Sequence, residues 1–121
     1  MVYRDYRRHA AARHLSFELG FEQFLHLTRQ RCAYCGAPPG NVARPSRNRP
    51  EFMYTGIDRQ ENSLGYTVEN CVPCCAQCNS IKRGLPYAAW EQWLDRVARY
   101  YKEGRARRLW QPSPVATCAV G

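Results

Sequence analysis

Apolar residues recur at helical spacing near the start of the chain. Residues 2–14 contain neither proline nor glycine, and Tyr3, Tyr6 and Ala10 form a thin apolar side. The other positions are rich in arginine, so the pattern predicts a helix with a basic outer face. We expect that face to contact phosphate groups.

The periodicity changes twice before the first cysteine. Residues 15–19 alternate apolar and polar side chains, which is typical of a short strand. An i, i+3, i+4, i+7 pattern then predicts a short helix whose periodic positions are Phe21, Phe24, Leu25 and Thr28. Prolines and glycines in residues 36–50 predict a mobile loop. Its arginines could reach a ligand, and they are Arg44, Arg47 and Arg49.

The middle of the chain has the order strand, strand, helix. Residues 52–57 have the aromatic and β-branched content of a strand, and residues 62–65 supply a turn. A second strand is expected near Val72, followed by a helix from Cys75 to Arg83.

A last helix is predicted over residues 86–103, with Pro86 in its first turn. One apolar face, interpreted as core packing, comprises Trp90, Leu94, Val97 and Tyr101. The basic, proline-containing tail at residues 104–121 is expected to be disordered or loosely attached. The sequence therefore suggests an N-terminal helix or arm at residues 1–14, one domain at 15–103, and this tail.

The net charge of the chain favours a negatively charged partner. The formal net charge is +8, from 16 arginines and 2 lysines against 10 acidic residues. Guanidinium groups bind phosphate oxygens in bidentate fashion, so we expect DNA as the partner, with RNA left open. A basic surface that only maintains solubility is the alternative. The residues expected to contact nucleic acid are Arg4, Arg7, Arg8, Arg13, Lys82 and Arg83.

Four cysteines occur as two Cys-x-x-Cys pairs, Cys32/Cys35 and Cys75/Cys78. Each pair lets two thiolates from one tight turn meet a Zn²⁺ at about 2.3 Å, and two such turns complete a tetrahedral site. Gly36, after the first pair, tolerates the positive φ that helps a backbone fold around a metal. The sequence therefore predicts a structural zinc that stabilises this short chain.

Cys71 and Cys74 have the same spacing and offer an alternative second pair. We favour Cys75 and Cys78 because a strand followed by a helix places both sulfurs on the first helical turn. The free N–H groups and the helix dipole there favour thiolate. Cys71 and Cys74 are then interpreted as small buried residues, and Cys118 as a bystander thiol.

No stretch of the chain is apolar enough for a signal peptide or a membrane span. We expect a soluble, cytoplasmic protein, and in that reducing compartment cysteines favour metal over disulfides. The sequence leaves open whether the protein is a monomer or a dimer.

A second metal site is predicted beside the zinc. Asp58 at the end of a strand and Asn79 in the following helix would bring a carboxylate and an amide oxygen together. Oxygen ligands of this kind suit Mg²⁺ or Mn²⁺. The alternative is that Asp58 pairs with Arg59 or Arg83 and that the asparagines are plain turn and cap residues.

Between residues 15 and 100 the chain resembles the HNH endonucleases of the ββα-metal (His-Me finger) superfamily, especially small phage-type members. The resemblance rests on Cys32-Ala-Tyr-Cys35-Gly36, Ile57-Asp58, Glu69-Asn70 and Cys75-Ala-Gln-Cys78-Asn79-Ser-Ile-Lys82. It implies an α+β fold, a small zinc-stabilised ββα-metal domain with flanking helices, and a bacterial or phage-infected cell.

The resemblance also implies roles for single residues. Asp58 and Asn79 would bind the catalytic Mg²⁺ or Mn²⁺, and Asn70 would brace the loop. Arg59 stands where the family has its general-base histidine, as in an Asp-Arg variant, and a guanidinium cannot accept a proton. Arg59 is instead expected to bind the scissile phosphate.

A substitute base would have to come from the N-terminal part of the chain, where all three histidines lie. These are His9, His14 and His26, of which His14 is expected to be best placed. We therefore expect a metal-dependent DNA endonuclease that hydrolyses phosphodiester bonds. The alternative is a catalytically impaired nucleic-acid-binding protein of the same fold.

Overall fold

The computed structural model describes residues 2–48 and 50–107. These residues belong to two compact units, Met1–Tyr87 and Ala88–Gly121. The N-terminal helix lies within the first unit, and nearly all of the last helix lies within the second.

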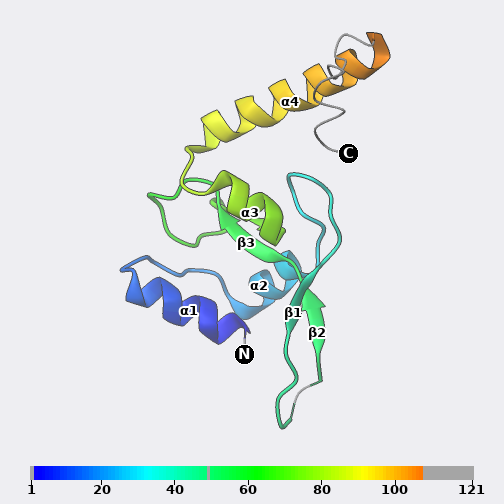
Figure 1. The fold of residues 1–121 in the computed structure, drawn as a ribbon. Coiled ribbons are helices and arrows are strands. Elements are labelled where there is room, and N and C mark those ends of the chain that lie inside the picture. Colours follow the sequence, from blue (N-terminus) through cyan, green and yellow to red (C-terminus); the bar gives the residue numbers. More distant parts are fainter. Residues whose placement is uncertain (1, 49, 108–121) are drawn as a thin grey trace, which may run out of the picture. The chain divides into compact units, whose positions relative to one another are not determined.

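The first unit is an α+β assembly built around two antiparallel strand pairs (Figure 1). The N-terminal, Phe21–Thr28 and post-cysteine helices are confirmed, as is the strand near Val72. In chain order the elements are α1 (Val2–Ala12), α2 (Phe21–Thr28), β1 (Asn41–Ala43), β2 (Phe52–Tyr54), β3 (Gly56–Arg59), β4 (Cys71–Cys74) and α3 (Ala76–Lys82).

The pair β3–β4 and the helix α3 form the predicted strand–strand–helix arrangement. Asp58 lies opposite Val72, and Arg59 lies opposite Cys71. The loop between the strands contains the expected turn near residues 62–65. The strands thus present Asp58 and Arg59 at the point where β3 ends and the loop begins.

Residues 15–19 do not form the expected strand. They make a single parallel bridge, between Phe17 and Tyr66. The Glu18 N–H donates to the Tyr66 carbonyl at 2.7 Å, and the Tyr66 N–H donates to the Ser16 carbonyl at 2.9 Å. Pairing cannot extend further because one side continues into a helix and the other into a turn.

The loop expected at residues 36–50 contains β1, and the strand expected at residues 52–57 is interrupted at Thr55. The Thr55 N–H donates to the Thr28 carbonyl at 2.8 Å, and its hydroxyl donates to the Gln30 carbonyl. These bonds to the end of α2 take Thr55 out of the ladder, so β2 pairs with β1 while β3 pairs with β4.

The core of the first unit joins α1, α2 and β3. Tyr3 packs edge-to-face on Phe24 with ring centroids 5.0 Å apart, a geometry worth about 0.5–1.5 kcal/mol beyond burial. The Ile57 N–H donates to the Tyr6 hydroxyl at 3.1 Å. This core fixes α1 beside β3, and its buried residues are Ala10, Leu19, Phe24, Ile57, Tyr66 and Cys71.

The second unit is dominated by α4 (Tyr87–Arg107), which is longer than the helix predicted at residues 86–103. Trp90 stacks on Trp93 with ring centroids 5.6 Å apart. Val97 and Tyr101, predicted as core positions, are largely exposed. The first residues of the tail predicted at 104–121 belong to this helix, which ends at Arg107. Residues 108–121, including Cys118, lie outside the described part. Among the described residues, no helix combines the length and apolar character that crossing a bilayer requires.

Candidate metal centre and active site

The two predicted cysteine pairs come together in space. The sulfurs of Cys32, Cys35, Cys75 and Cys78 all lie within 4.8 Å of one another, and Cys35 Sγ is 3.6 Å from Cys75 Sγ. A tetrahedral Zn²⁺ with bonds of about 2.3 Å requires sulfurs about 3.8 Å apart. The cluster therefore fits a four-coordinate zinc ion, as the sequence predicts.

The first cysteine pair is held by backbone bonds within a tight turn. The Gly36 N–H donates to the Cys32 carbonyl, and the Cys32 N–H donates to the Ala37 carbonyl, both at 2.9 Å. Gly36 has a φ of 77°, which a side chain would disfavour. The Ala33 N–H donates to the Pro73 carbonyl at 2.8 Å, so this turn is attached directly to β4.

The second cysteine pair lies at the start of α3. Cys75 caps the helix, and its sulfur accepts a hydrogen bond from the Cys78 N–H at 3.4 Å. Backbone N–H groups also shape the ionisation of Cys32. Burial opposes ionisation there, but hydrogen bonds from Cys75, Cys35 and Tyr34 outweigh it and lower the pKa of Cys32 to about 6.

Burial and the neighbouring thiols raise the pKa of Cys78. Four thiolates this close together would repel one another strongly unless a cation lay between them, so the cluster is suited to a metal. Cys71 and Cys74 are buried outside the cluster, and burial raises the pKa of Cys71 to about 11. Both behave as the packing residues that the sequence predicts.

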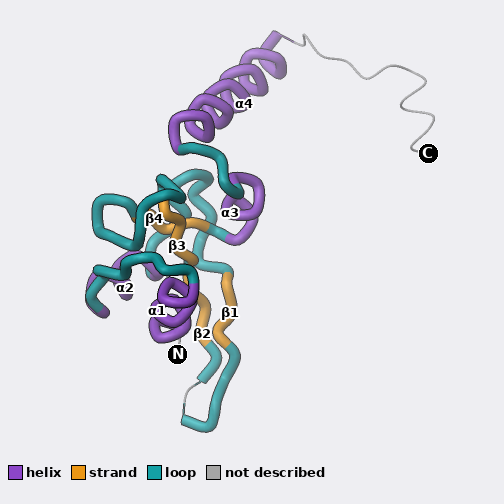
Figure 2. The backbone as a smooth tube through the Cα atoms, turned by 90° about the vertical axis from the view of Figure 1, so that its left-hand side faces the viewer, coloured by secondary structure: helices purple, strands orange, loops and turns teal. Residues whose placement is uncertain are grey.

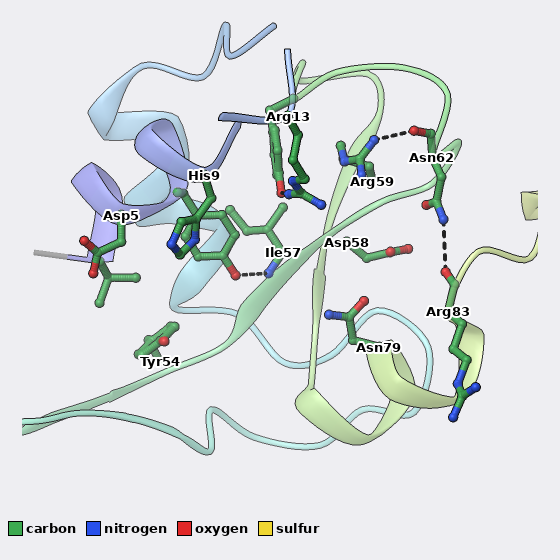
Figure 3. Close-up of a pocket in the computed structure, with 13 residues that line it drawn as sticks. Asp5, His9, Arg13, Tyr54, Ile57, Asp58, Arg59, Asn62, Asn79 and Arg83 are labelled. Atoms are coloured by element: carbon green, nitrogen blue, oxygen red, sulfur yellow. Dashed lines mark hydrogen bonds between the residues drawn. The ribbon is translucent and has the colours of Figure 1, made fainter. Parts of the chain in front are cut away.

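A pocket of about 480 Å³ lies beside the strand–strand–helix arrangement (Figure 3). β3 contributes Asp58 and Arg59, and α3 contributes Asn79. α1 contributes His9, and Arg13 follows that helix directly. The structure thus gathers three of the four predicted catalytic residues around one hollow, together with an imidazole and two further arginines, Arg13 and Arg83.

Asp58 is buried and held by two side chains that the sequence had not linked to it. The Tyr34 hydroxyl donates to Asp58 Oδ2 at 2.7 Å. Burial, and after it this bond to the carboxylate, raises the pKa of Tyr34. Lys82 Nζ lies 3.2 Å from Oδ2 and 3.4 Å from Oδ1. Lys82, expected at a nucleic-acid-binding surface, is fully buried, so that prediction is wrong for the protein as described.

The carboxylate and amide oxygens at this site are of the kind that a hard divalent cation takes as ligands. A carboxylate has about four lone-pair positions, and the bonds to Tyr34 and Lys82 occupy three of them. The side chain of Asn79 points toward Asp58 in Figure 3. One carboxylate and one amide oxygen would leave the remaining positions of Mg²⁺ or Mn²⁺ to water and phosphate. Lys82 compensates the charge of Asp58, so the protein provides little net negative charge there.

Arg59 is oriented by the loop that follows it. Its Nη1 donates to the Leu64 carbonyl at 2.8 Å and to the Asn62 carbonyl, and its guanidinium lies 5.4 Å from the centroid of the Tyr66 ring. Arg13 Nη2 donates to the Tyr66 hydroxyl at 3.2 Å. Tyr66, which the sequence did not single out, therefore positions two guanidinium groups at the pocket.

Asn70 is buried beneath the same loop. Its Oδ1 accepts from the Glu61 N–H at 2.9 Å, while its Nδ2 donates to the carbonyls of Glu61 and Gly65 at 3.1 and 2.9 Å. The Asn70 side chain thus holds both ends of the loop that orients Arg59.

The N-terminal residues divide between two surfaces. His9 lines the pocket, whereas His14, expected to be the better placed, is exposed and is not among its lining residues. Helical spacing decides this, because His9 lies on the same side of α1 as Asp5 and Tyr6, which also line the pocket. A second hollow on the opposite side is lined by Tyr3, Arg4, Arg7 and Arg8.

Comparisons with known proteins bear on the fold. No family model matches the sequence. The structure resembles that of the rare-cutting HNH restriction endonuclease PacI, with a TM-score of 0.56 and 18% identity over 86% of this chain and 78% of that chain. An uncharacterized protein of Acanthamoeba polyphaga mimivirus is 30% identical over 100 residues. That match covers 83% of this chain but only 17% of the viral protein.

Proposed function

We propose that this HNH-like domain is a metal-dependent endonuclease that hydrolyses phosphodiester bonds in DNA. The observation that carries the proposal is the pocket itself, where Asp58 and Asn79 face two guanidinium groups positioned by one tyrosine. Hard oxygen ligands beside phosphate-binding arginines are what hydrolysis of a charged diester needs. The similarity to an HNH restriction endonuclease supports the same chemistry.

The residues of the pocket would have different roles in hydrolysis. Asp58 and Asn79 would hold Mg²⁺ or Mn²⁺, which supplies charge neutralisation at the phosphate. Arg59 and Arg13 would bind the non-bridging phosphate oxygens, where negative charge develops during hydrolysis. Asn70 would keep Arg59 in place through the loop that it braces.

The proton acceptor is assigned to His9. Arg59 remains protonated and cannot take a proton from water. Among the described residues, His9 is the histidine that lines the pocket, and an imidazole accepts a proton near neutral pH. α1 is fixed beside β3 by the bond between the Ile57 N–H and the Tyr6 hydroxyl, one helical turn from His9.

Nicking of a supercoiled plasmid with added Mg²⁺ or Mn²⁺ tests the proposed function. Asp58→Asn removes the carboxylate but also leaves Lys82 unpaired, so the variant is compared with the double variant Asp58→Asn/Lys82→Met, which removes both partners of the buried pair. In variants whose circular dichroism matches wild type, nicking should be abolished and DNA binding intact, because binding depends on the arginines. Asp95→Asn is the matched control, since Asp95 is an exposed acid on α4. Equal nicking by wild type and Asp58→Asn would exclude the proposed site.

A nucleic-acid-binding protein without hydrolysis is the second candidate function. It is favoured by the buried Lys82–Asp58 pair, because a neutralised carboxylate attracts a cation less strongly. Tight DNA binding by a zinc-loaded protein that nicks with neither Mg²⁺ nor Mn²⁺ would establish this alternative.

A further inference from the structure

The β1–β2 hairpin forms a two-stranded ribbon that extends away from the rest of the first unit (Figures 1 and 2). Its strands pair with Val42 opposite Met53 and Ala43 opposite Phe52. Neighbouring residues of a strand point to opposite faces, so Val42 and Met53 share one face of the ribbon. That face is open, with Val42 50% and Met53 59% exposed, whereas on the other face Ala43 is buried and Phe52 is 38% exposed.

We propose that the Val42–Met53 face of this ribbon enters the major groove of a DNA duplex whose phosphate occupies the pocket. The inference rests on the proposed function and adds that the substrate is double-stranded. Paired strands lie about 4.8 Å apart, and a major groove about 12 Å wide admits a two-stranded ribbon with its side chains. An undistorted minor groove, about 6 Å wide, is too narrow for it, and entry there would require the duplex to be widened or bent.

The chemistry of the ribbon suits the edges of base pairs. Val42 and Met53 offer apolar atoms to thymine methyl groups, which the major groove exposes. Arg44 and Arg47 follow β1 and are exposed, where a guanidinium can reach phosphate or guanine. A second copy of this chain is a poorer occupant, because it would bring the same arginines and the same net charge of +8 to the contact.

The ribbon is also continuous with the active site. β2 ends at Tyr54, which lines the pocket, and Thr55 alone separates it from the strand that carries Asp58. Four residues of extended chain span about 13 Å. Bases contacted by the ribbon would therefore lie within one helical turn, about 34 Å, of the phosphate in the pocket.

Fluorescence anisotropy of labelled DNA tests this inference without cleavage, in buffer lacking added Mg²⁺ and Mn²⁺. The full chain carrying Val42→Ser and Met53→Ser should bind a duplex about 10-fold more weakly, with single-strand binding unchanged. Val68→Ser is the matched control, because Val68 is 52% exposed and lies outside the hairpin. Zinc content and circular dichroism should match wild type in each variant.

Arg47→Ala provides a second variant that leaves the apolar face intact. It should weaken duplex binding and lower the salt dependence of binding. Methyl green, a major-groove ligand, should displace the wild-type protein, and distamycin, a minor-groove ligand, should not. Equal duplex binding by the double variant and Val68→Ser, displacement by distamycin alone, or loss of a wild-type dimer in the double variant would each overturn the inference. Absence of nicking would overturn the proposed function alone, since these measurements need no catalysis.

Discussion

Lys82 Nζ lies 3.2 Å from Asp58 Oδ2. Both side chains are buried: that of Lys82 is fully buried and that of Asp58 is 5% exposed. The lysine comes from the last turn of α3 and the aspartate from β3, so the ion pair fastens the helix to the strand. Removing one partner of such a pair leaves an uncompensated buried charge. The pair therefore links the stability of the fold to the charge state of the candidate active site.

Lys82→Met should lower the free energy of unfolding by about 3–5 kcal/mol. A divalent cation can replace the missing ammonium, so added Mn²⁺ should stabilise this variant more than it stabilises wild type. Urea unfolding with and without Mn²⁺, in buffer that keeps the zinc bound, measures both effects. Lys102→Met is the control because Lys102 is exposed. A loss below about 1 kcal/mol would show that the pair contributes little to stability.

Removal of the cysteine ligands should unfold the first unit. A structural zinc in a small domain contributes about 10–16 kcal/mol, which is comparable with the whole stability of a domain. Cys75→Ser should therefore lose zinc and helical circular dichroism, as should wild type treated with a strong chelator. Cys74→Ala should keep its zinc, since Cys74 lies outside the cluster. Loss of zinc from Cys74→Ala alone would instead favour the Cys71/Cys74 pair.

The stability of the fold should depend on pH through Tyr6. Burial raises the pKa of Tyr6 from 10.0 to about 12, and the bond from the Ile57 N–H opposes this only in part. Neutral Tyr6 is thus favoured in the folded state, so its contribution is complete below pH 10 and is lost as the pH rises through about 12. The loss amounts to about 2–3 kcal/mol.

Tyr6→Phe isolates this contribution from other groups that ionise at alkaline pH. The variant is expected to be less stable than wild type at pH 8 by about 1–3 kcal/mol, because the Ile57 N–H loses its partner. The difference between the two proteins should narrow between pH 10 and 12 in urea unfolding experiments. A constant difference over that range would contradict the assignment to Tyr6.

The four cysteines of the candidate zinc centre could be predicted from the sequence because the Cys-x-x-Cys spacing limits the choice and the expected helix after β4 favours Cys75 and Cys78 over Cys71 and Cys74. The tight turns that hold the cysteines are local structures, so the positions of the cysteines and of Gly36 are enough to predict them. The split at Thr55 could not be predicted, because it depends on hydrogen bonds to residues 28 and 30, distant in the chain. Likewise β1 forms in a proline-rich segment because β2 lies beside it.

The arrangement of the candidate active site could be predicted only where local motif and tertiary structure coincide. Asp58 and Asn79 fall on neighbouring elements of one strand–strand–helix arrangement, so their shared pocket followed from the sequence. The ion pair of Asp58 with Lys82 could not be predicted, because the sequence offered only Arg59 or Arg83 as alternative partners and the burial of Lys82 depends on how α3 packs. His9 lines the pocket because the core fixes the rotation of α1 through Tyr3 and Tyr6, whereas His14 lies beyond the end of that helix with a positive φ of 56°.

The assignment of His9 as proton acceptor leads to a test with four variants. His9→Ala should reduce the rate of plasmid nicking by about 10²- to 10⁴-fold, the usual contribution of a general base. His14→Ala, the control, should nick at the wild-type rate. DNA binding should be unchanged in both, since neither histidine is needed for contacts to phosphate.

Arg59→His adds the decisive comparison. A histidine at this position stands directly after Asp58, where it can accept a proton, so the double variant His9→Ala/Arg59→His should recover part of the lost rate. Arg59→His alone should gain little, because the wild-type chain already has a base and loses the guanidinium that binds phosphate. Wild-type nicking by His9→Ala would instead place the proton acceptor outside α1, and a double variant as inactive as His9→Ala would mean that Arg59 is required as an arginine.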